Sequence, residues 1–212
     1  LRCRSRRRRR KRGRLRTTNG GTTWQTGVVR GADTLQFRDV HAVDANTAYL
    51  LSIGNGDQSR IYKTTNAGAN WTLQFTNPDP KAFYDCMDFW DPRRGVVIGD
   101  AIDGDLAILT TTDAGATWNR VPPATLPRAL TGEGSFAASG TCLITRPGGH
   151  AWVVSNNDAH ARVLHSADYG VCDTCGADIA FRRLQQVLES ALHLGDGGVV
   201  VLIDDHPGRV AL

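Results

Sequence analysis

Short apolar runs separated by polar turns recur along the middle of the chain, at a fixed distance from one another. The run VHAVD at Val40–Asp44 matches MDFWD at Met87–Asp91, and AYLLSIG at Ala48–Gly54 matches GVVIGDA at Gly95–Ala101. Both pairs are 47 residues apart. Short apolar runs bounded by turn residues predict β-strands. A fixed period of this size is typical of propellers and solenoids, in which one supersecondary unit repeats.

A polar motif repeats in the same register as the apolar runs. Its three copies are TTNGGTTW at Thr17–Trp24, TTNAGANW at Thr64–Trp71 and TTDAGATW at Thr111–Trp118. The second copy follows a strand-like run at Arg60–Lys63, and the third follows one at Leu106–Thr110. Each motif is therefore predicted to form the turn of a β-hairpin. Because the flanking runs repeat together with the motif, the repeating unit is larger than the motif itself.

Each copy of the motif contains an amide or carboxylate, a glycine and a final tryptophan. An Asn or Asp side chain can accept hydrogen bonds from backbone N–H groups about two residues further on, and Gly adopts positive φ without steric cost. The tryptophan is large enough to pack over the hairpin. The alternative is that the Asn or Asp positions are metal ligands or catalytic carboxylates, but two of the three are neutral amides. We expect structural roles for Asn19, Gly21, Trp24, Asn66, Gly68, Trp71, Asp113, Gly115 and Trp118.

These residues resemble the Asp-box, or BNR, repeat, whose consensus is Ser/Thr-x-Asp-x-Gly-x-Thr-Trp. The resemblance covers about residues 16–170 and implies four-stranded blades, with the box between the third and fourth strands and away from the central channel. Such repeats occur in sialidases, in related glycoside hydrolases and in photosystem II stability/assembly-factor-like propellers, which are not enzymes. The stretch DCMDFWDPRRGVVIGD at 85–100 is most similar to the last of these branches.

The repeats account for three to four blades. A degraded fourth box, SADYGVCD, occupies Ser166–Asp173. The chain would then hold the tail of one blade (14–30), two complete blades (36–75 and 83–121) and most of another (135–170). Propellers close with about four to eight blades. We therefore predict an all-β fold, a partial β-propeller of about three to four four-stranded blades over 17–170 with a short α-containing C-terminal extension. Its open sheet edges would favour self-association.

Positive charge is concentrated in residues 1–16. This segment contains ten Arg and one Lys without an acidic residue, whereas the rest of the chain carries a net charge of −7. Blocks of like charge are typically disordered and often bind nucleic acid. Three interpretations stay open: an artefactual or truncated N-terminus, a solvated tail, or a polyanion-binding arm. We expect nucleic acid as a partner only through this tail.

Export and cysteine pairing are less clearly indicated. No apolar stretch has the length of a transmembrane helix, and no signal-peptide segment follows the arginines. Relatives with Asp-box repeats are usually exported, so the localisation stays open. The five cysteines are an odd number with only one close pair, which argues against a disulfide framework. Cys86 and Cys142 lie in apolar strand contexts and are expected to be buried thiols.

Residues 171–212 differ from the repeats. Cys172 and Cys175 form a C-x2-C pair ahead of a predicted helix at 179–192. Two thiolates at this spacing are a common half of a tetrahedral zinc site, and His193 and Asp196, which follow after 17 residues, could supply the second half. The alternative is that both are ordinary helix-end residues. The phrase at 169–185 resembles the zinc finger of the DksA/TraR family, which binds RNA polymerase, although the second cysteine pair of that finger is replaced here.

Catalysis by this chain is not expected. A sialidase-like mechanism needs three arginines, a Tyr–Glu nucleophile pair and an Asp acid. The propeller section lacks the usual Arg-Ile-Pro phrase, and its only Glu is Glu133. A retaining glycosidase also needs two carboxyl groups about 5 Å apart. Six aspartates between 85 and 105 are candidates for such a pair, but their spacings fit strand ends and turns equally well.

The function expected from the sequence is that of a non-catalytic scaffold or protein-interaction fragment, with a protein partner and no cofactor unless zinc binds. A zinc-finger regulator of RNA polymerase and a sialidase-like glycoside hydrolase are the alternatives. A ligand site, if there is one, is expected at the channel end of the innermost strands. His41 and Asp88 occupy matching positions there in two blades.

Overall fold

A computed structural model describes residues 14–137, 141–168, 171–173, 202–203 and 210–211. Almost all regular structure in these ranges is β: three four-stranded antiparallel sheets and two two-stranded ones. The helices described are the single turns η1 (Gly56–Gln58) and η2 (Pro123–Thr125), and neither is long and apolar enough to cross a membrane. The all-β, blade-based fold predicted from the repeat is confirmed, while the helix predicted at 179–192 lies outside the described residues.

Each four-stranded sheet is a meander in which strands that follow one another in sequence are paired. The first blade consists of β3 (Gln36–Ala42), β4 (Ala48–Ile53), β5 (Arg60–Thr64) and β6 (Thr72–Thr76). The second blade consists of β7 (Tyr84–Phe89), β8 (Gly95–Ile102), β9 (Asp105–Thr111) and β10 (Asn119–Arg120). The third blade consists of β11 (Leu143–Arg146), β12 (His150–Asn156), β13 (Ala161–Asp168) and β14 (Val171–Asp173).

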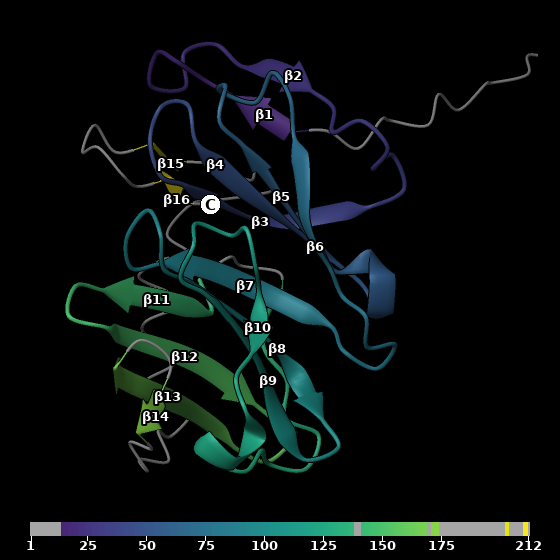
Figure 1. The fold of residues 1–212 in the computed structure, drawn as a ribbon, viewed down its shortest axis with the longest axis vertical. Helices are drawn as coiled ribbons and strands as arrows, with labels where there is room; N and C mark the ends of the chain where they lie inside the picture. Colours follow the sequence, from purple (N-terminus) through teal and green to yellow (C-terminus); the bar gives the residue numbers. More distant parts are fainter. Residues whose placement is uncertain (1–13, 138–140, 169–170, 174–201, 204–209, 212) are drawn as a thin grey trace, which may run out of the picture.

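Two short sheets accompany the blades. β1 (Arg14–Arg16) pairs with β2 (Gln25–Gly27), and the first copy of the polar motif forms the turn between them. β15 (Leu202–Ile203) pairs with β16 (Val210–Ala211), and β16 contacts β3 of the first blade. The C-terminal end of the chain therefore returns to the first blade (Figure 1).

The third blade extends beyond residue 170, and its last strand lies within the degraded box. The backbones of Cys172 and Asp173 pair in β14 with Ser166 and His165 of β13. The last strand of this blade thus lies three residues past 170, where the propeller section was predicted to end.

The blades pack face to face through apolar side chains. One cluster joins the first blade to the second and includes Tyr49, Leu51, Phe89 and Val97. Another joins the second blade to the third through Ile98, Ile108, Val153 and Leu164, among others. Because side chains alternate between the faces of a strand, the central strands of the second blade are apolar on both faces. This explains the apolar runs VVI in β8 and LAIL in β9.

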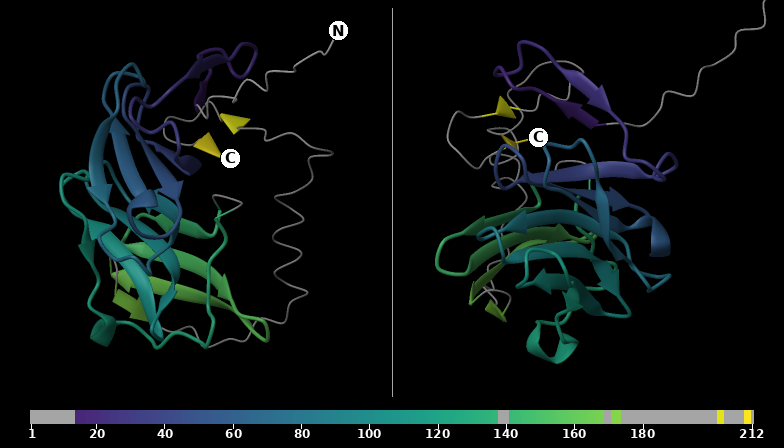
Figure 2. Two further views of the ribbon diagram at one scale, coloured as in Figure 1. Left: turned by 90° about the vertical axis from the view of Figure 1, so that its right-hand side faces the viewer. Right: turned by 45° about the horizontal axis from the view of Figure 1, so that its top comes forward.

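The described blades form an open stack. The first blade packs on one face of the second blade and the third blade packs on the other; Figure 2 shows the three blades in two further views. The first strands of the blades lie next to each other, with β7 in contact with both β3 and β11. These three strands belong to separate sheets, so no β-ladder joins one blade to the next in the described residues.

Candidate functional site

The three repeated turns share one hydrogen-bond pattern. In the second blade, the Thr111 hydroxyl donates to Asp113 Oδ1 (2.8 Å), and the Gly115 N–H donates to the Thr111 hydroxyl (2.9 Å). The Thr117 N–H donates to Asp113 Oδ1 (2.9 Å), four residues on and not two as predicted. The same three bonds join Thr17, Asn19, Gly21 and Thr23 in the first turn, and Thr64, Asn66, Gly68 and Asn70 in the next. The Asn and Asp side chains hold these turns together.

The backbone of each turn passes through two consecutive left-handed residues. Gly115 has the positive φ predicted for it (78°), and Ala114 before it also has one (61°). The same holds for Ala67 and Gly68 in the first blade. The N–H of Ala114 donates to the carbonyl of Arg93 (2.8 Å), which ties the turn to the β7–β8 connection of its own blade.

The tryptophans that end the three motifs are buried to different extents. Trp118 is only 8% exposed, in the cluster between the first two blades, and Trp71 packs against the apolar cluster on the other face of the first blade. Trp24, at the end of the turn between β1 and β2, is 38% exposed. In the two complete blades the tryptophans therefore have the packed positions that the repeat predicts.

The first strands of the blades bring His41 and Asp88 together, as the matching register suggested. His41 Nδ1 lies 2.9 Å from Asp88 Oδ1. The other oxygen, Asp88 Oδ2, accepts hydrogen bonds from the N–H (2.7 Å) and hydroxyl (3.0 Å) of Thr145. Burial alone would raise the pKa of Asp88, but the bonds from His41, Thr145 and Phe89 hold it below its ordinary value. Asp88 thus connects β3, β7 and β11 as a carboxylate.

A second aspartate, which the sequence analysis did not single out, joins the first two blades. Asp39 in β3 is 3% exposed, and its carboxyl accepts the N–H of Met87 in β7 (2.6 Å) and that of Val40 (2.7 Å). Burial raises the pKa of Asp39 to about 7, against the lowering effect of these two bonds. The strand sequence QFRDVHA does not mark Asp39 as buried, because Gln, Arg and His lie in the same run.

A disulfide joins the second and third blades, so the expectation that Cys86 and Cys142 are free buried thiols is wrong. Cys86 in β7 is bonded to Cys142, which directly precedes β11, and their Cα atoms are 6.2 Å apart. That separation is within the usual range for a disulfide. The two cysteines are 56 residues apart in the chain. The pairing was missed because they belong to the starts of consecutive blades, which only the folded arrangement brings side by side.

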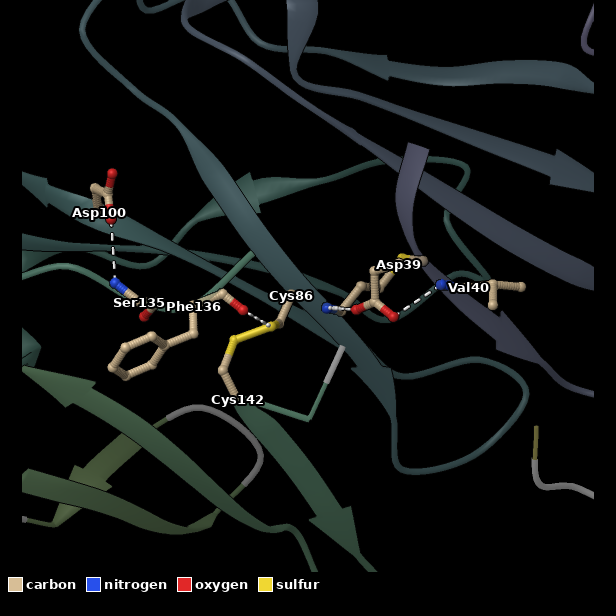
Figure 3. Close-up of a disulfide and its surroundings, with 8 residues drawn as sticks. Asp39, Val40, Cys86, Asp100, Ser135, Phe136 and Cys142 are labelled. Carbon is tan, nitrogen blue, oxygen red and sulfur yellow. Dashed lines mark hydrogen bonds between the residues drawn. A yellow bond between two sulfur atoms is a disulfide. The ribbon is translucent and has the colours of Figure 1, made fainter. Parts of the chain in front are cut away.

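Asp39 and Cys86 occupy the same position in consecutive blades. Asp39 is opposite Leu51 and Cys86 is opposite Ile98, both separated by one 47-residue period. Each reaches toward the first strand of the following blade. Figure 3 shows the Asp39 carboxyl and the disulfide close together along β7. The Asp39 carboxyl and the disulfide Cys86–Cys142 are together the candidate functional site that the geometry supports.

A buried pair of carboxyl groups lies near the disulfide. Asp85 is 2% exposed, and its side chain hydrogen-bonds that of Asp100, which also accepts the N–H of Ser135 (3.1 Å). Burial and the neighbouring Asp100 raise the pKa of Asp85 to about 8, and burial raises that of Asp100 as well. A protonated Asp85 donating to Asp100 accounts for this contact.

Glu133, the only glutamate of the propeller section, is also buried. Its carboxylate accepts hydrogen bonds from Arg162 (2.5 Å), the Ser155 hydroxyl (2.5 Å) and the N–H of Leu130 (2.7 Å). Glu133 is 3% exposed. Its hydrogen bonds with Ser155 and Arg162 fix the segment before β11 against the third blade.

The candidate zinc ligands fall mostly outside the described residues. Cys175, His193 and Asp196 lie there, and for Cys172 only the backbone in β14 is described. Within the described ranges, no group of three or more His, Cys, Asp or Glu side chains is arranged to hold a metal ion. The arginine-rich segment before residue 14 also lies outside.

Comparisons with known proteins give a likeness to solved structures but no match to a family model or curated protein. Among solved structures, the chain is similar to one described as YCF48 bound to D1 peptide, with 18% identity and a TM-score of 0.44. The matched region covers 65% of this chain and 39% of that one. The chain therefore spans less than half the length of that structure.

Proposed function

We propose that this chain is a non-catalytic β-propeller scaffold of the Asp-box type that binds a protein partner. The observation that carries the proposal is that the polar side chains on the first strands form bonds between neighbouring blades. Asp39 and Asp88 accept backbone N–H groups of the neighbouring blade, and His41 pairs with Asp88. These side chains already hold neighbouring blades together, as is expected of residues with a structural role.

The rigidity of the framework supports this role. Because neighbouring blades share no β-ladder within the described residues, side chains must fix their relative positions. The bond from Met87 to Asp39, the bonds from Thr145 to Asp88 and the disulfide Cys86–Cys142 do so across two junctions. Each of these links is largely buried, so water does not compete for it.

An exposed aromatic side chain near the disulfide supports the proposal that the chain binds a protein partner. Phe136 is 40% exposed, and its carbonyl oxygen lies 3.7 Å from the sulfur of Cys86. The same loop is held by the bond from Ser135 to Asp100 and by the buried Glu133. Aromatic anchors are enriched in protein interfaces, and a loop that is already ordered loses little entropy on binding. We infer that Phe136 is an anchor for the partner.

The disulfide also bears on where the protein functions. Disulfides form and persist in oxidising compartments and are rare in the cytosol. With Cys86 and Cys142 buried and bonded, we infer that the chain works outside the cytosol.

Panning of a displayed random-peptide library against the purified chain tests the proposal. We expect peptides to be enriched, and Phe136→Ser to weaken their binding at least about tenfold. Leu73→Ser is the matched control, since Leu73 is equally exposed (45%) but lies on the outermost strand of the first blade. Failure to enrich any peptide, or equal binding by Phe136→Ser, would refute the assignment of a partner site to Phe136.

Catalysis is tested separately with chromogenic glycosides. We expect no release of chromophore above the background of a mock purification. Hydrolysis that scales with protein concentration and disappears in Asp88→Asn would replace the scaffold by the glycoside hydrolase alternative.

A further inference from the structure

The two faces of the third blade are buried to different extents. Leu143, Ala151, Val153 and Leu164 point toward the second blade and are buried against it. Because side chains alternate along a strand, the intervening residues point the other way. We call this second surface the outer face of the third blade; its centre consists of Ile144, Trp152, Val154, Val163 and His165, and the pairs Arg146–His150 and Asn156–Ala161 lie at its two ends.

The centre of the outer face is apolar and partly open. Ile144 is 41% exposed and Trp152 is 36% exposed. Trp152 stacks on His165 with ring centroids 4.8 Å apart, so the indole is held in one orientation on the sheet. The charged residue among the described side chains of this face is Arg146, which lies at its end, one row beyond Ile144 and Trp152. Exposed apolar side chains that gather on one face typically mark an interaction site.

The repeat shows what kind of surface covers such a face. In the second blade, the positions that match Trp152, Val154 and Val163 are held by Val96, Ile98 and Ile108, which have the same cross-strand register. These three residues are only 3%, 1% and 4% exposed. They are buried because another four-stranded sheet of the same repeat lies on them. A four-stranded sheet is thus the surface that fits this face.

The outer face is complementary to itself. Ile144, Trp152 and His165 form one cross-strand row, and Val154 and Val163 form the next, about 7 Å further along the strands. A two-fold axis between the rows would place Trp152 over the partner subunit's Val154 and Val163, and the reverse. A large aromatic would then oppose two small aliphatic side chains twice, without any charged group between them.

We propose that two copies of this chain associate through the outer faces of their third blades to form a symmetric dimer. Two-fold symmetry is the commonest form of self-association among soluble proteins. The proposal does not rest on the partner site at Phe136, which precedes β11 and is not among the residues of the outer face.

Light scattering after size-exclusion chromatography of the full chain tests the proposal. We expect a mass of twice that of the 23.0 kDa chain. Trp152→Arg and Val163→Glu, which bury a charge at the contact, should each give a monomer with an unchanged circular dichroism spectrum. Leu73→Arg places the same charge on an equally exposed side chain of the first blade and should leave the dimer intact.

A mixture of the two charged variants tests the two-fold arrangement. In the proposed dimer, an Arg at 152 of one copy opposes a Glu at 163 of the other, while the second contact stays native. An equimolar mixture should therefore recover a dimer that neither variant forms alone. A wild-type monomer at all concentrations, or a dimer that survives Trp152→Arg, would overturn the proposal, and a mixture that stays monomeric would overturn the two-fold axis.

Discussion

At the scale of single residues, one position of the repeat is occupied by different chemistry in different blades but serves one purpose. The Asp39 carboxyl binds a backbone N–H of the second blade, and the Cys86 sulfur bonds covalently to the start of the third. Both residues stand at the same register position and contact the first strand of the next blade. A junction without a β-ladder needs such a link, and either chemistry provides it.

Removal of the disulfide should destabilise the fold. The double variant Cys86→Ser/Cys142→Ser is expected to lose about 2–5 kcal/mol of unfolding free energy, because the unfolded chain is no longer cross-linked. Urea denaturation with and without reductant measures the effect. Reductant should destabilise the wild-type chain and leave the double variant unchanged; an effect of reductant on the double variant would locate the sensitive bond elsewhere.

Raised carboxyl pKa values make the protein less stable in alkaline solution. The pKa of Asp85 is about 8 and that of Asp39 about 7 in the folded state, against 3.8 for an ordinary Asp. Between these values the folded state binds more protons than the unfolded state, so stability falls as the pH rises. The urea midpoint should decrease from about pH 5 to about pH 9. Asp85→Asn, which stays uncharged, should flatten this decrease, and an equally steep decrease in that variant would contradict the assignment.

At the scale of elements, the repeated turns hold the outer strands of each blade. Asp113 accepts three hydrogen bonds, from the Thr111 hydroxyl and from the N–H and hydroxyl of Thr117. In the first blade the equivalent Asn66 accepts the matching bonds through its amide oxygen. The turn therefore requires an oxygen acceptor at this position and does not require a charge.

The comparison of two substitutions at Asp113 tests this requirement. Asp113→Ala should lower the unfolding free energy by about 1–3 kcal/mol, because three donors lose their acceptor. Asp113→Asn should cost much less, since Asn66 already performs this role. Chemical denaturation measures both, and binding of selected peptides should be unchanged in either variant. Equal losses for the two variants would show that the charge itself matters.

The strands and turns of the blades were predictable because each is specified locally and then repeated. The alternation within runs such as Val40–Asp44 and the turn residues of the motif both recur after 47 residues, so one unit supports the interpretation of the next. The contacts between blades were not predictable in the same way. Asp39, Glu133 and the cysteine pair act across distances in sequence that depend on how the sheets stack. The meeting of His41 and Asp88 was anticipated only as matching register, without their hydrogen bond.

At the scale of the whole molecule, the dense positive charge lies in a different part of the sequence from the blades. Residues 1–16 carry eleven positive charges, while the remainder, which includes the blades, is negative overall. A cationic segment of this density binds polyanions regardless of their sequence, and salt weakens the binding. The polyanion-binding interpretation of this tail can therefore be examined without disturbing the blades.

Deletion of residues 1–13 provides the test. The full chain should be retained on a heparin column and elute with salt, whereas the shortened chain should pass through, because its net charge is negative. The thermal transition of both proteins should be the same. Retention of the shortened chain would place the polyanion site on the blades.

The disulfide between β7 and β11 also has a mechanical consequence. It encloses residues 87–141, which include most of the second blade, in a covalent loop. When tension is applied at the two ends of the chain, the load passes through the sulfur atoms, and the enclosed residues bear none of it. About 190 Å of contour length would be withheld from extension until the bond is reduced. Under force, the second blade would be the part of the chain that keeps its length while the first and third are drawn out.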